Sequence, residues 1–599
     1  MLFKSQSRLL GMASTVALST ATFAALAAFQ PAAAQSVGLY GGGSSLSSLT
    51  MRQIFDCFGH HPAADGYATT TVSPLTPGQL PSTCAAPFSS ADEGLFASVG
   101  SGRGLQAFVA NDAKQLVNGG PNGASSTVSL PAVPPVFIDT GSSSSAFNTY
   151  PYPSLVFGAS DAPLPISTGN TTITTSAFTF NTSTNWDVDG TTTPTTIAVT
   201  ATATVTYDAA NRGAAVQLPL FEAPVAIAIN TNNASKFQIQ SALTAGTAGS
   251  AIQLSTAQVC AIFSGTVTDW DSTANITALN AAGSQITEPF DTDNVGLSAP
   301  TPQPYASSTL PIQIVYRGDG SGTSFIFANY LHNSCAPLAN ATNSYSTIFP
   351  NPLSSTGVPN TSFLTAVVNN ALAVHSGAHF TPETGSIGVA TQIGTARAAA
   401  GSIGYLSADF TQPYANATIL GTAAPLSASI QDQSQQSVGI LHPSQANFIA
   451  PTPAGADGAF QTLEAFAPVN STFSNVAWNL YAAVYPTSAG TTLAGKSILG
   501  IPNQANAYPI TGTTFMFLSS CYSNASAATD LTNFIDWYYG GTTGAANGTV
   551  SAVLANNGFS PLIPAIAGAI VQEYANGGSA SITAASTGGN GCPSGAHGA

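Results

Sequence analysis

Charged residues are scarce in this chain. Asp, Glu, Lys and Arg make up only 6% of its 599 residues, and 10 Lys and Arg stand against 25 Asp and Glu, which gives a formal net charge of −15. Binding to a phosphate backbone needs clustered Lys and Arg, so we expect no nucleic-acid partner. The acidic balance also disfavours long-range attraction of small anions. An anion site in this chain must therefore work through local hydrogen bonds in a closed cleft.

Long apolar runs are missing after residue 34. No run in that part of the chain approaches the length of a membrane span. Residues 1–34 begin with Lys4 and Arg8, continue with an apolar run and end in Ala32-Ala33-Ala34. This pattern is typical of a secretory signal cleaved after Ala34. An N-terminal membrane anchor is the alternative, but the small residues at the end of the run favour cleavage. We therefore expect a periplasmic or secreted protein.

Cysteine is also rare, and no two of the six cysteines have the spacing of metal ligands. In an exported chain, an even number of cysteines indicates disulfides. Six cysteines allow fifteen pairings. We expect the sequential pairing, Cys57–Cys84, Cys260–Cys335 and Cys521–Cys592.

Catalytic motifs are missing as well. There is no Gly-x-Ser-x-Gly elbow and no Ser/His/Asp arrangement typical of hydrolases. His375 and His379 have the i, i+4 spacing of a metal pair. Gly377 lies between them and no carboxylate is placed beside them, so ordinary polar positions are favoured. The sequence predicts no enzyme, no metal and no cofactor.

Glycine and hydroxyl residues, by contrast, form a distinctive loop, Tyr316-Arg317-Gly318-Asp319-Gly320-Ser321-Gly322-Thr323. Residues 311–316 predict a buried strand, and Ser321 or Thr323 can cap a helix that runs to about Asn333. A helix N-terminus, two hydroxyls and the Arg317 guanidinium together suit a tetrahedral oxyanion. A plain surface turn before a capped helix is the alternative. A nucleotide phosphate loop is disfavoured because the Lys-Ser/Thr pair is missing.

This loop resembles the phosphate-contacting loop of the periplasmic phosphate-binding protein of ABC phosphate importers. Three further stretches resemble that family's other ligand segments, in the family's order. They are Gly41-Gly42-Gly43-Ser44-Ser45-Leu46, Val99-Gly100-Ser101-Gly102-Arg103-Gly104 and Phe157-Gly158-Ala159-Ser160-Asp161-Ala162-Pro163-Leu164. A chance match to one loop is easy, whereas four in order are not.

The resemblance implies a set of phosphate ligands: Ser45, the Leu46 N–H, Ser101, Asp161, Arg317, Asp319, Ser321, the Gly322 N–H and Thr323. Asp161 would accept the proton that phosphate carries and sulfate lacks, and Asp319 would hold the Arg317 guanidinium. Ser45 stands where the family usually has Thr, and Leu46 where it has Phe. Arg103 replaces a usual glycine and is either an additional cation or solvent-facing. Both alternatives are open.

The resemblance also implies an α/β fold of two lobes, each a mixed sheet flanked by helices. Residues 35–223 and 508–599 would form lobe I, and residues 224–507 would form lobe II. Two stretches, 218–230 and 507–515, would cross between the lobes. Segments near 60–92, 118–152, 165–215 and 275–305 are insertions outside the resemblance. The Thr-rich alternation in 165–215 predicts β-hairpins.

Taken together, these features predict a monomeric exported protein that binds inorganic phosphate between its lobes and delivers it to an inner-membrane ABC permease. One alternative is a surface or matrix scaffold, or an adhesin, that keeps the binding-protein fold. Another is a phosphatase or phosphoryl-transfer enzyme. Saturable phosphate binding distinguishes the first reading from the second, and turnover of a phosphate ester would support the third.

Overall fold

The computed structural model describes most of the chain after residue 38. The expected signal segment and most of the segments 60–92 and 118–152 lie outside the described residues. The main described ranges are 39–59, 94–111, 155–165, 205–230, 246–279, 284–293, 304–394, 401–415, 424–434, 448–464, 478–489, 493–578, 581–588 and 591–599, with short pieces between 84 and 203. Within the part described, residues from Gly38 onward form one compact unit.

A ten-stranded mixed sheet organises this unit, and it confirms the predicted α/β fold class. Eight strands lie in the order β12-β11-β13-β7-β17-β4-β1-β2, while β14 (Leu426–Ser427) and β19 (Ser560–Pro561) pair with β7. The bounds of the eight are β1 Leu39–Gly43, β2 Gly94–Ser98, β4 Phe157–Ser160, β7 Ala215–Ile229, β11 Gln313–Arg317, β12 His379–Glu383, β13 Ser402–Ser407 and β17 Thr511–Ser519.

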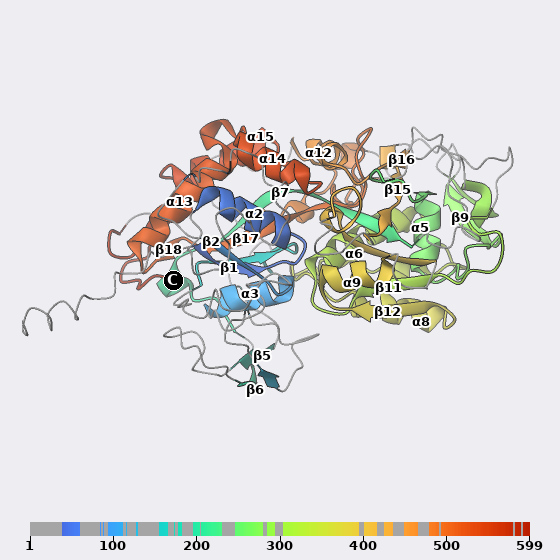
Figure 1. Ribbon diagram of the computed structural model, residues 1–599, viewed down its shortest axis with the longest axis horizontal. Coiled ribbons are helices and arrows are strands. Elements are labelled where there is room, and N and C mark those ends of the chain that lie inside the picture. The colour runs from blue at the N-terminus through green and yellow to red at the C-terminus, as the bar shows by residue number, and fades with distance from the viewer. Residues whose placement is uncertain are drawn as a thin grey trace, which may run out of the picture. The chain divides into compact units, whose positions relative to one another are not determined.

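Six of the ten strands form two parallel groups, one of β2, β1 and β4 and the other of β13, β11 and β12. The long strand β7 joins them (Figure 1): its first part pairs with β17 and its last part pairs with β13, both antiparallel. Because β17 is also antiparallel to β4, the two groups run in opposite directions. The stretches expected to cross between lobes are thus adjacent strands, and the lobe boundaries stay a prediction.

Helices cover this sheet near the predicted positions. The helix predicted for 45–59 is α2 (Ser48–Phe58), and the one predicted to end at about Asn333 is α6 (Gly322–Cys335). Helix α9 (Gly385–Ile393) begins at Gly385, where the resemblance implies a helix. The sequence also predicts a helix over Asp530–Tyr539, and α13 (Ala525–Tyr539) begins five residues before that stretch. Other described helices include α5 (Thr256–Phe263), α8 (Asn369–Val374), α12 (Pro453–Gln461), α14 (Gly548–Asn556) and α15 (Pro564–Ile570). No helix in the described ranges is both long and apolar enough to cross a membrane.

One helix differs clearly from its prediction. The sequence predicts a helix over 103–117, but α3 spans Ser101–Ala110. It ends at Asn111, whose φ of 52° is left-handed and whose N–H bonds the carbonyls of Ala107 and Phe108. The distant Arg212 guanidinium donates to the carbonyls of Phe108 and Val109 at 2.8 and 3.1 Å. A cation at the last carbonyls stabilises a helix end, so a tertiary contact assists this termination.

The insertions contain β-structure where the structure describes them. Strand β5 (Phe178–Asn181) pairs antiparallel with β6 (Thr196–Ala203), which confirms strand pairing in the Thr-rich segment. Strand β6 also pairs with β3 (Thr127–Ser129), so the two insertions at 118–152 and 165–215 share one small sheet. Strands β9 (Asn275–Leu279) and β10 (Gln285–Pro289) form a further antiparallel pair.

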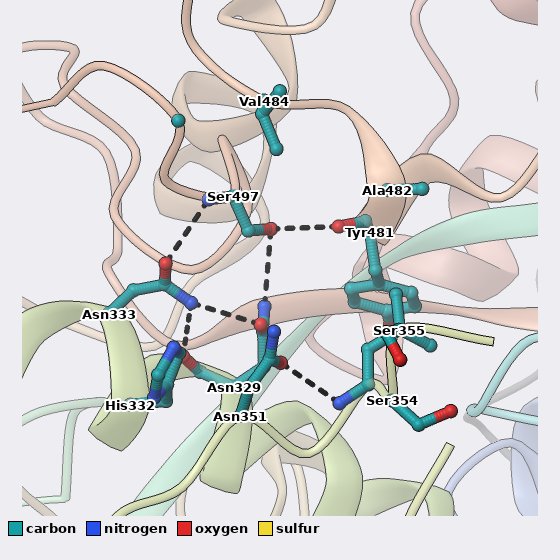
Figure 2. A pocket seen from close by; sticks show the side chains of 12 residues that line it. Asn329, His332, Asn333, Asn351, Ser354, Ser355, Tyr481, Ala482, Val484 and Ser497 are labelled. Carbon is teal, nitrogen blue, oxygen red and sulfur yellow. Dashed lines mark hydrogen bonds between the residues drawn. The ribbon is translucent and has the colours of Figure 1, made fainter. Parts of the chain in front are cut away.

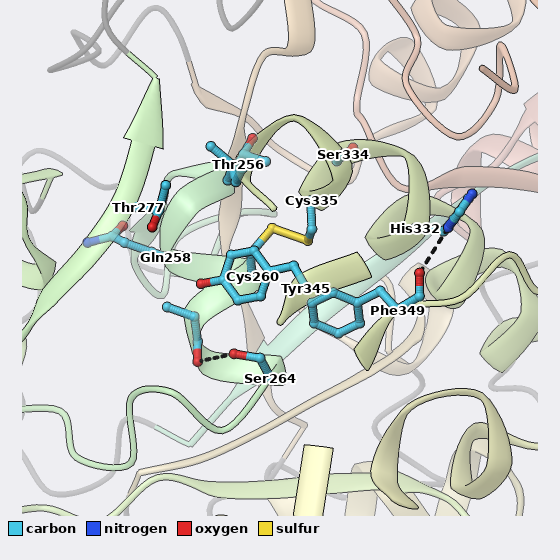
Figure 3. Close-up of a disulfide and its surroundings, with 12 residues drawn as sticks. Thr256, Gln258, Cys260, Ser264, Thr277, His332, Ser334, Cys335, Tyr345 and Phe349 are labelled. Atoms are coloured by element: carbon cyan, nitrogen blue, oxygen red, sulfur yellow. Dashed lines mark hydrogen bonds between the residues drawn. A yellow bond between two sulfur atoms is a disulfide. The ribbon is translucent and has the colours of Figure 1, made fainter. Parts of the chain in front are cut away.

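All three disulfides follow the predicted sequential pairing. The Cys260–Cys335 bond links α5 to the last residue of α6, as Figure 3 shows. Its two cysteines are fully buried. This bond therefore secures the helix that begins directly after the glycine loop.

Removing this disulfide is expected to destabilise the protein strongly. It closes 75 residues of sequence, and cross-linking a loop of that length stabilises a fold by about 4 kcal/mol on the chain-entropy account. Chemical denaturation of a Cys260→Ser/Cys335→Ser variant measures the loss. The matched Cys57→Ser/Cys84→Ser variant, whose bond spans 27 residues, is expected to lose less. An equal or larger loss in that control would contradict loop length as the cause.

Candidate functional site

The carboxyl ends of both parallel strand groups meet near the middle of β7. At the end of β4, Ser160 pairs with Phe515, which in turn pairs with Pro219 of β7. At the end of β13, Ser407 pairs with Val225 of β7. Open α/β sheets hold ligands just outside the carboxyl ends of their strands. The opposed directions of the two groups therefore bring two such edges together.

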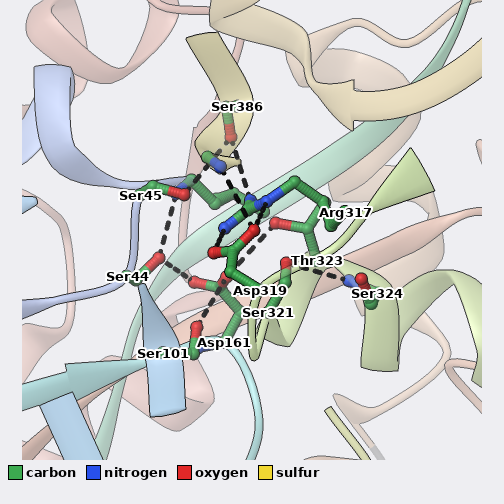
Figure 4. A network of polar contacts seen from close by, with 12 residues as sticks. Ser44, Ser45, Ser101, Asp161, Arg317, Asp319, Ser321, Thr323, Ser324 and Ser386 are labelled. Carbon is green, nitrogen blue, oxygen red and sulfur yellow. Dashed lines mark hydrogen bonds and ion pairs between the residues drawn. The ribbon is translucent and has the colours of Figure 1, made fainter. Parts of the chain in front are cut away.

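Each of these six strands is followed or ended by polar residues of one candidate site, most of which Figure 4 shows. They are Ser44 and Ser45 after β1, Ser101 after β2, Asp161 after β4, Arg317 at the end of β11, Ser386 after β12, and Ser407 with Asp409 at and after the end of β13.

Asp161 lies at the centre of the site and is only 1% exposed. Its Oδ1 accepts hydrogen bonds from the hydroxyls of Ser44 and of Thr514, the latter at 2.7 Å. Its Oδ2 accepts from Ser101 at 3.2 Å and from Thr323 at 3.4 Å. Burial raises the pKa of Asp161, while the hydroxyl donors and the charge of Arg317 oppose that rise. One carboxyl group thus gathers hydroxyls from four separate parts of the chain.

Arg317 is the buried cation of the site. Its Nε donates to Oδ1 of Asp319 at 2.7 Å, and its Nη2 forms a salt bridge with Oδ2 of the same residue. Burial acts to raise the pKa of Asp319, but Arg317 and hydrogen bonds outweigh it and hold that pKa below its ordinary value. Arg317 Nη1 also donates to the Ser386 hydroxyl at 3.3 Å. Arg317 thus pairs with Asp319, as the resemblance implied.

Other residues of the glycine loop contact Asp161, the start of α6 and the start of α3. Ser321 caps α6, because its hydroxyl accepts from the Ser324 N–H at 3.3 Å. Thr323 reaches Asp161 instead. The loop also contacts the start of α3, where the Gly102 N–H donates to the Gly320 carbonyl at 3.3 Å. Residues predicted from four separate stretches are therefore brought together in one place.

Ser45 and Leu46 lie on the same loop, with different partners. The Ser45 hydroxyl is 3.4 Å from that of Ser386, which itself accepts from Arg317. The Leu46 N–H donates to the Ser44 hydroxyl at 3.1 Å, and the Leu46 side chain is fully buried. The loop after β1 thus connects the Asp161 and Arg317 halves of the site.

Five site residues were not among the residues predicted from the sequence: Ser44, Ser386, Ser407, Asp409 and Thr514. Ser44 is adjacent to the predicted Ser45, and Ser386 follows Gly385 at the start of α9. Thr514 lies inside β17, at a register shift between Thr513 and Phe515. Such bulges redirect a side chain, here toward Asp161. Because the chain is so rich in Ser and Thr, a single hydroxyl residue does not stand out as a site residue. The adjacent pair Thr513-Thr514 is the only sequence feature that could have pointed to one of these residues.

Arg103, the candidate additional cation, is half-buried on α3. Its Nη1 lies 3.4 Å from Oε1 of Gln106, and its Nη2 has no hydrogen-bond partner among the described residues. Burial lowers the pKa of Arg103. The guanidinium is therefore neither freely solvated nor part of the ion pair formed by Arg317.

The two histidines with the spacing of a metal pair, His375 and His379, lie apart from this site. His375 Nε2 is 3.4 Å from the Thr266 hydroxyl, and His379 is exposed at the start of β12. Within the described ranges, no three His, Cys, Asp or Glu side chains gather as metal ligands would.

A separate cavity of about 440 Å³ lies beside the C-terminal half of α6 (Figure 2). Its polar side chains hydrogen-bond to one another and to the backbone: Asn333 Nδ2 donates to Asn329 Oδ1 at 3.0 Å, and Asn333 Oδ1 accepts from the backbone N–H of Ser497 at 3.1 Å. It is lined by Asn329, His332, Asn333, Asn351, Leu353, Ser354, Ser355, Tyr481, Ala482, Val484, Gly495 and Ser497, with no Lys or Arg. It shares no residue with the candidate site.

Gly322 lies close against Asp161 and leaves no room for a side chain. A Cβ at this position would lie 2.6 Å from the Cβ of Asp161 and 2.7 Å from the backbone N of Ala162. Gly322→Ala is therefore expected to lower the free energy of unfolding by about 1–3 kcal/mol through overpacking. Urea denaturation measures this loss. Gly102→Ala is the control, because a Cβ there has ordinary contacts no closer than 3.6 Å. Equal stability of the two variants would show that the close approach relaxes freely.

Comparison with known proteins adds to this geometry. Residues 192–541 match the family model of the PBP superfamily domain. "Alkaline phosphatase L" of Pseudomonas aeruginosa is 26% identical over 336 residues, which cover 56% of this chain and 64% of the relative. A "Phosphate-binding protein" of an unknown prokaryotic organism is 26% identical over 315 residues, which cover 52% of this chain and 64% of the relative. The chain thus spans less than two thirds of these relatives' length.

Among solved structures, the crystal structure of a DING protein has a TM-score of 0.50 and 20% sequence identity. The match covers 92% of this chain and 98% of that chain. At this level of identity the likeness concerns the fold.

Proposed function

Because this chain belongs to the PBP superfamily, as a match over more than half of its length shows, we propose that it binds inorganic phosphate at the site around Asp161 and Arg317. One observation carries the proposal: the buried carboxyl group of Asp161 and the buried guanidinium of Arg317 belong to one site and are both hydrogen-bonded to hydroxyl groups. A phosphate ion at pH 7 offers both negative oxygens and a proton. This arrangement offers donors together with one acceptor.

In this proposal, the donors are the Arg317 guanidinium, the N–H groups of Leu46 and Gly322, and the hydroxyls of Ser45, Ser101, Ser321 and Thr323. On binding, the hydroxyls of Ser101 and Thr323 turn from Asp161 to phosphate, and the Leu46 N–H turns from the Ser44 hydroxyl. Hydrogen bonds to charged groups contribute roughly 1.5–3 kcal/mol each. Asp161 accepts the phosphate proton. Asp319 orients Arg317, since it already holds that guanidinium through two nitrogens. Arg103, half-buried on the neighbouring helix, supplies additional positive potential.

We further propose that the protein is exported and acts as a monomer that delivers phosphate to an inner-membrane ABC permease. The lobes would close on the ion about the two crossing strands β7 and β17. The signal-like N-terminal segment, the disulfides and a relative named phosphate-binding protein support this assignment.

Equilibrium dialysis with radiolabelled phosphate tests the proposal, with sulfate and arsenate as competitors. We expect saturable binding of one phosphate per chain that excess sulfate does not displace. Absence of saturable binding at pH 7 would leave the scaffold alternative.

A phosphatase is the second candidate, because one relative is named alkaline phosphatase L. Hydrolysis of a phosphate ester by the purified protein, lost in Ser321→Ala, would support it. Binding of free phosphate without ester turnover supports the binding protein.

A further inference from the structure

Asp409 is a second buried carboxyl group at the same strand edges. It lies in the short helix η8 (Ala408–Phe410), which directly follows β13, and it is fully buried. Its Oδ1 bonds the Ser407 hydroxyl, and its Oδ2 has no hydrogen-bond partner among the described residues. An ionised carboxylate in such a place would keep one charged oxygen without compensation, which is costly.

The hydrogen-bond geometry at Ser407 also favours a neutral carboxyl. The Ser407 hydroxyl lies against Oδ1 of Asp409 and is 3.4 Å from the carbonyl oxygen of Leu46. A hydroxyl has one proton, so it can donate to only one of these two oxygens. If Asp409 is protonated, it donates to Ser407, and Ser407 donates to Leu46. Both contacts are then satisfied.

The electrostatic surroundings act in the same direction. Burial raises the pKa of Asp409 well above its ordinary value and outweighs the hydrogen bonds from Ser407 and from the Asp409 N–H, which lower it; the nearby Asp161 raises it further. Strand β7 and helix α9 pack against η8, and Leu49 of α2 shares a buried cluster with Phe410. Helix α9 has no titratable residue, and Glu222, the titratable residue of β7, interacts with Asp457 instead. Helix α2 carries Asp56 and Arg52, and Arg52 Nε donates to the Phe96 carbonyl at 3.1 Å. The charge that acts on Asp409 is that of Asp161, and it opposes ionisation.

We propose that Asp409 is a neutral positioning residue of the anion site, which holds the Ser44–Leu46 loop through Ser407, and whose ionisation weakens phosphate binding. This inference rests on the proposed function. Ionisation would release the carbonyl of Leu46, whose N–H is a proposed phosphate donor. It would also add a negative charge near Asp161 and the bound anion. Asp409 is therefore a positioning residue, since its contact to the loop passes through Ser407.

The test compares phosphate affinity of the unsubstituted chain and of Asp409→Asn between pH 6 and pH 10. Asparagine keeps a donor toward Ser407 and cannot ionise. The ratio of the two dissociation constants removes the titration of phosphate, because it is common to the two proteins. We expect similar affinities at pH 6, and above the pKa of Asp409 a relative loss in the unsubstituted chain of up to about tenfold per pH unit. A constant ratio across this range would overturn the inference.

A second measurement needs no phosphate. A carboxyl whose pKa is higher in the folded than in the unfolded state makes the folded state bind more protons. Stability then falls as pH rises from the unfolded value, near 3.9, toward the folded one. Denaturation at several pH values should show the unfolding constant of the unsubstituted chain rising by up to about tenfold per pH unit relative to Asp409→Asn. Parallel profiles would show that Asp409 is ionised in the fold.

The outcomes separate the two proposals. If the unsubstituted chain binds no phosphate at any pH, the proposed function fails and this inference fails with it. If it binds phosphate with a profile parallel to that of Asp409→Asn, only the inference fails. Should Asp409→Asn not fold, infrared spectra of the unsubstituted chain and of Ser407→Ala decide. A neutral-carboxyl band present at pH 7 and shifted by Ser407→Ala supports the inference, and a band that does not shift contradicts it.

Discussion

Arg317→Met is expected to lower phosphate affinity by between about a hundredfold and about ten-thousandfold. After the bonds to Asp319 and Ser386, the guanidinium keeps one N–H on each terminal nitrogen for an anion. Two hydrogen bonds to a charged group, at roughly 1.5–3 kcal/mol each, correspond to that range. Methionine fills much of the same volume without a donor. Isothermal titration with phosphate at pH 7 measures the loss.

The loss of affinity must be separated from a loss of stability. Without Arg317, the largely buried Asp319 carboxylate has no cation, and breaking a buried pair in this way costs about 3–5 kcal/mol. Arg317→Met/Asp319→Asn removes both charges and is expected to recover most of the stability but none of the affinity. Ser355→Ala, at the rim of the separate cavity, is the control that should change neither. Phosphate binding by the double variant with unchanged affinity would refute the role of Arg317.

Asp161→Asn is expected to change selectivity more than affinity. A carboxylate that faces an anion is repulsive unless a proton lies between them, and sulfate at pH 7 carries none. An unpaired buried carboxylate can reject such a ligand by a factor of about 10⁴ or more. The amide of asparagine donates to either anion, so we expect the preference for phosphate over sulfate to fall by at least about a hundredfold. Competition between radiolabelled phosphate and sulfate measures it.

Thr514→Val is the matched control for this prediction. It removes one hydroxyl from Oδ1 of Asp161 and leaves the carboxyl group in place. This variant should bind phosphate more weakly and still exclude sulfate. If Asp161→Asn excludes sulfate as fully as the unsubstituted chain does, proton sharing by Asp161 is wrong.

Local sequence determined much of this protein. The glycine loop with Ser321 predicted both the turn after β11 and the cap of α6, because only local hydrogen bonds and backbone freedom are needed there. β-branched runs predicted the buried strands, and the predicted disulfide pairing is confirmed. The resemblance of four short motifs to a known family's ligand segments predicted that Ser101, Asp161, Arg317 and Thr323 lie together.

Only the tertiary structure decided which further groups join them. Ser44, Ser386, Thr514 and Asp409 come from strand ends or a bulge whose positions depend on pairing between segments hundreds of residues apart. In the same way, Arg212 reaches the end of α3 from about a hundred residues away. Local propensity records what a few neighbouring residues prefer. The partners of a buried polar group are set by the packing of the whole sheet, and the sequence of any one segment does not contain them.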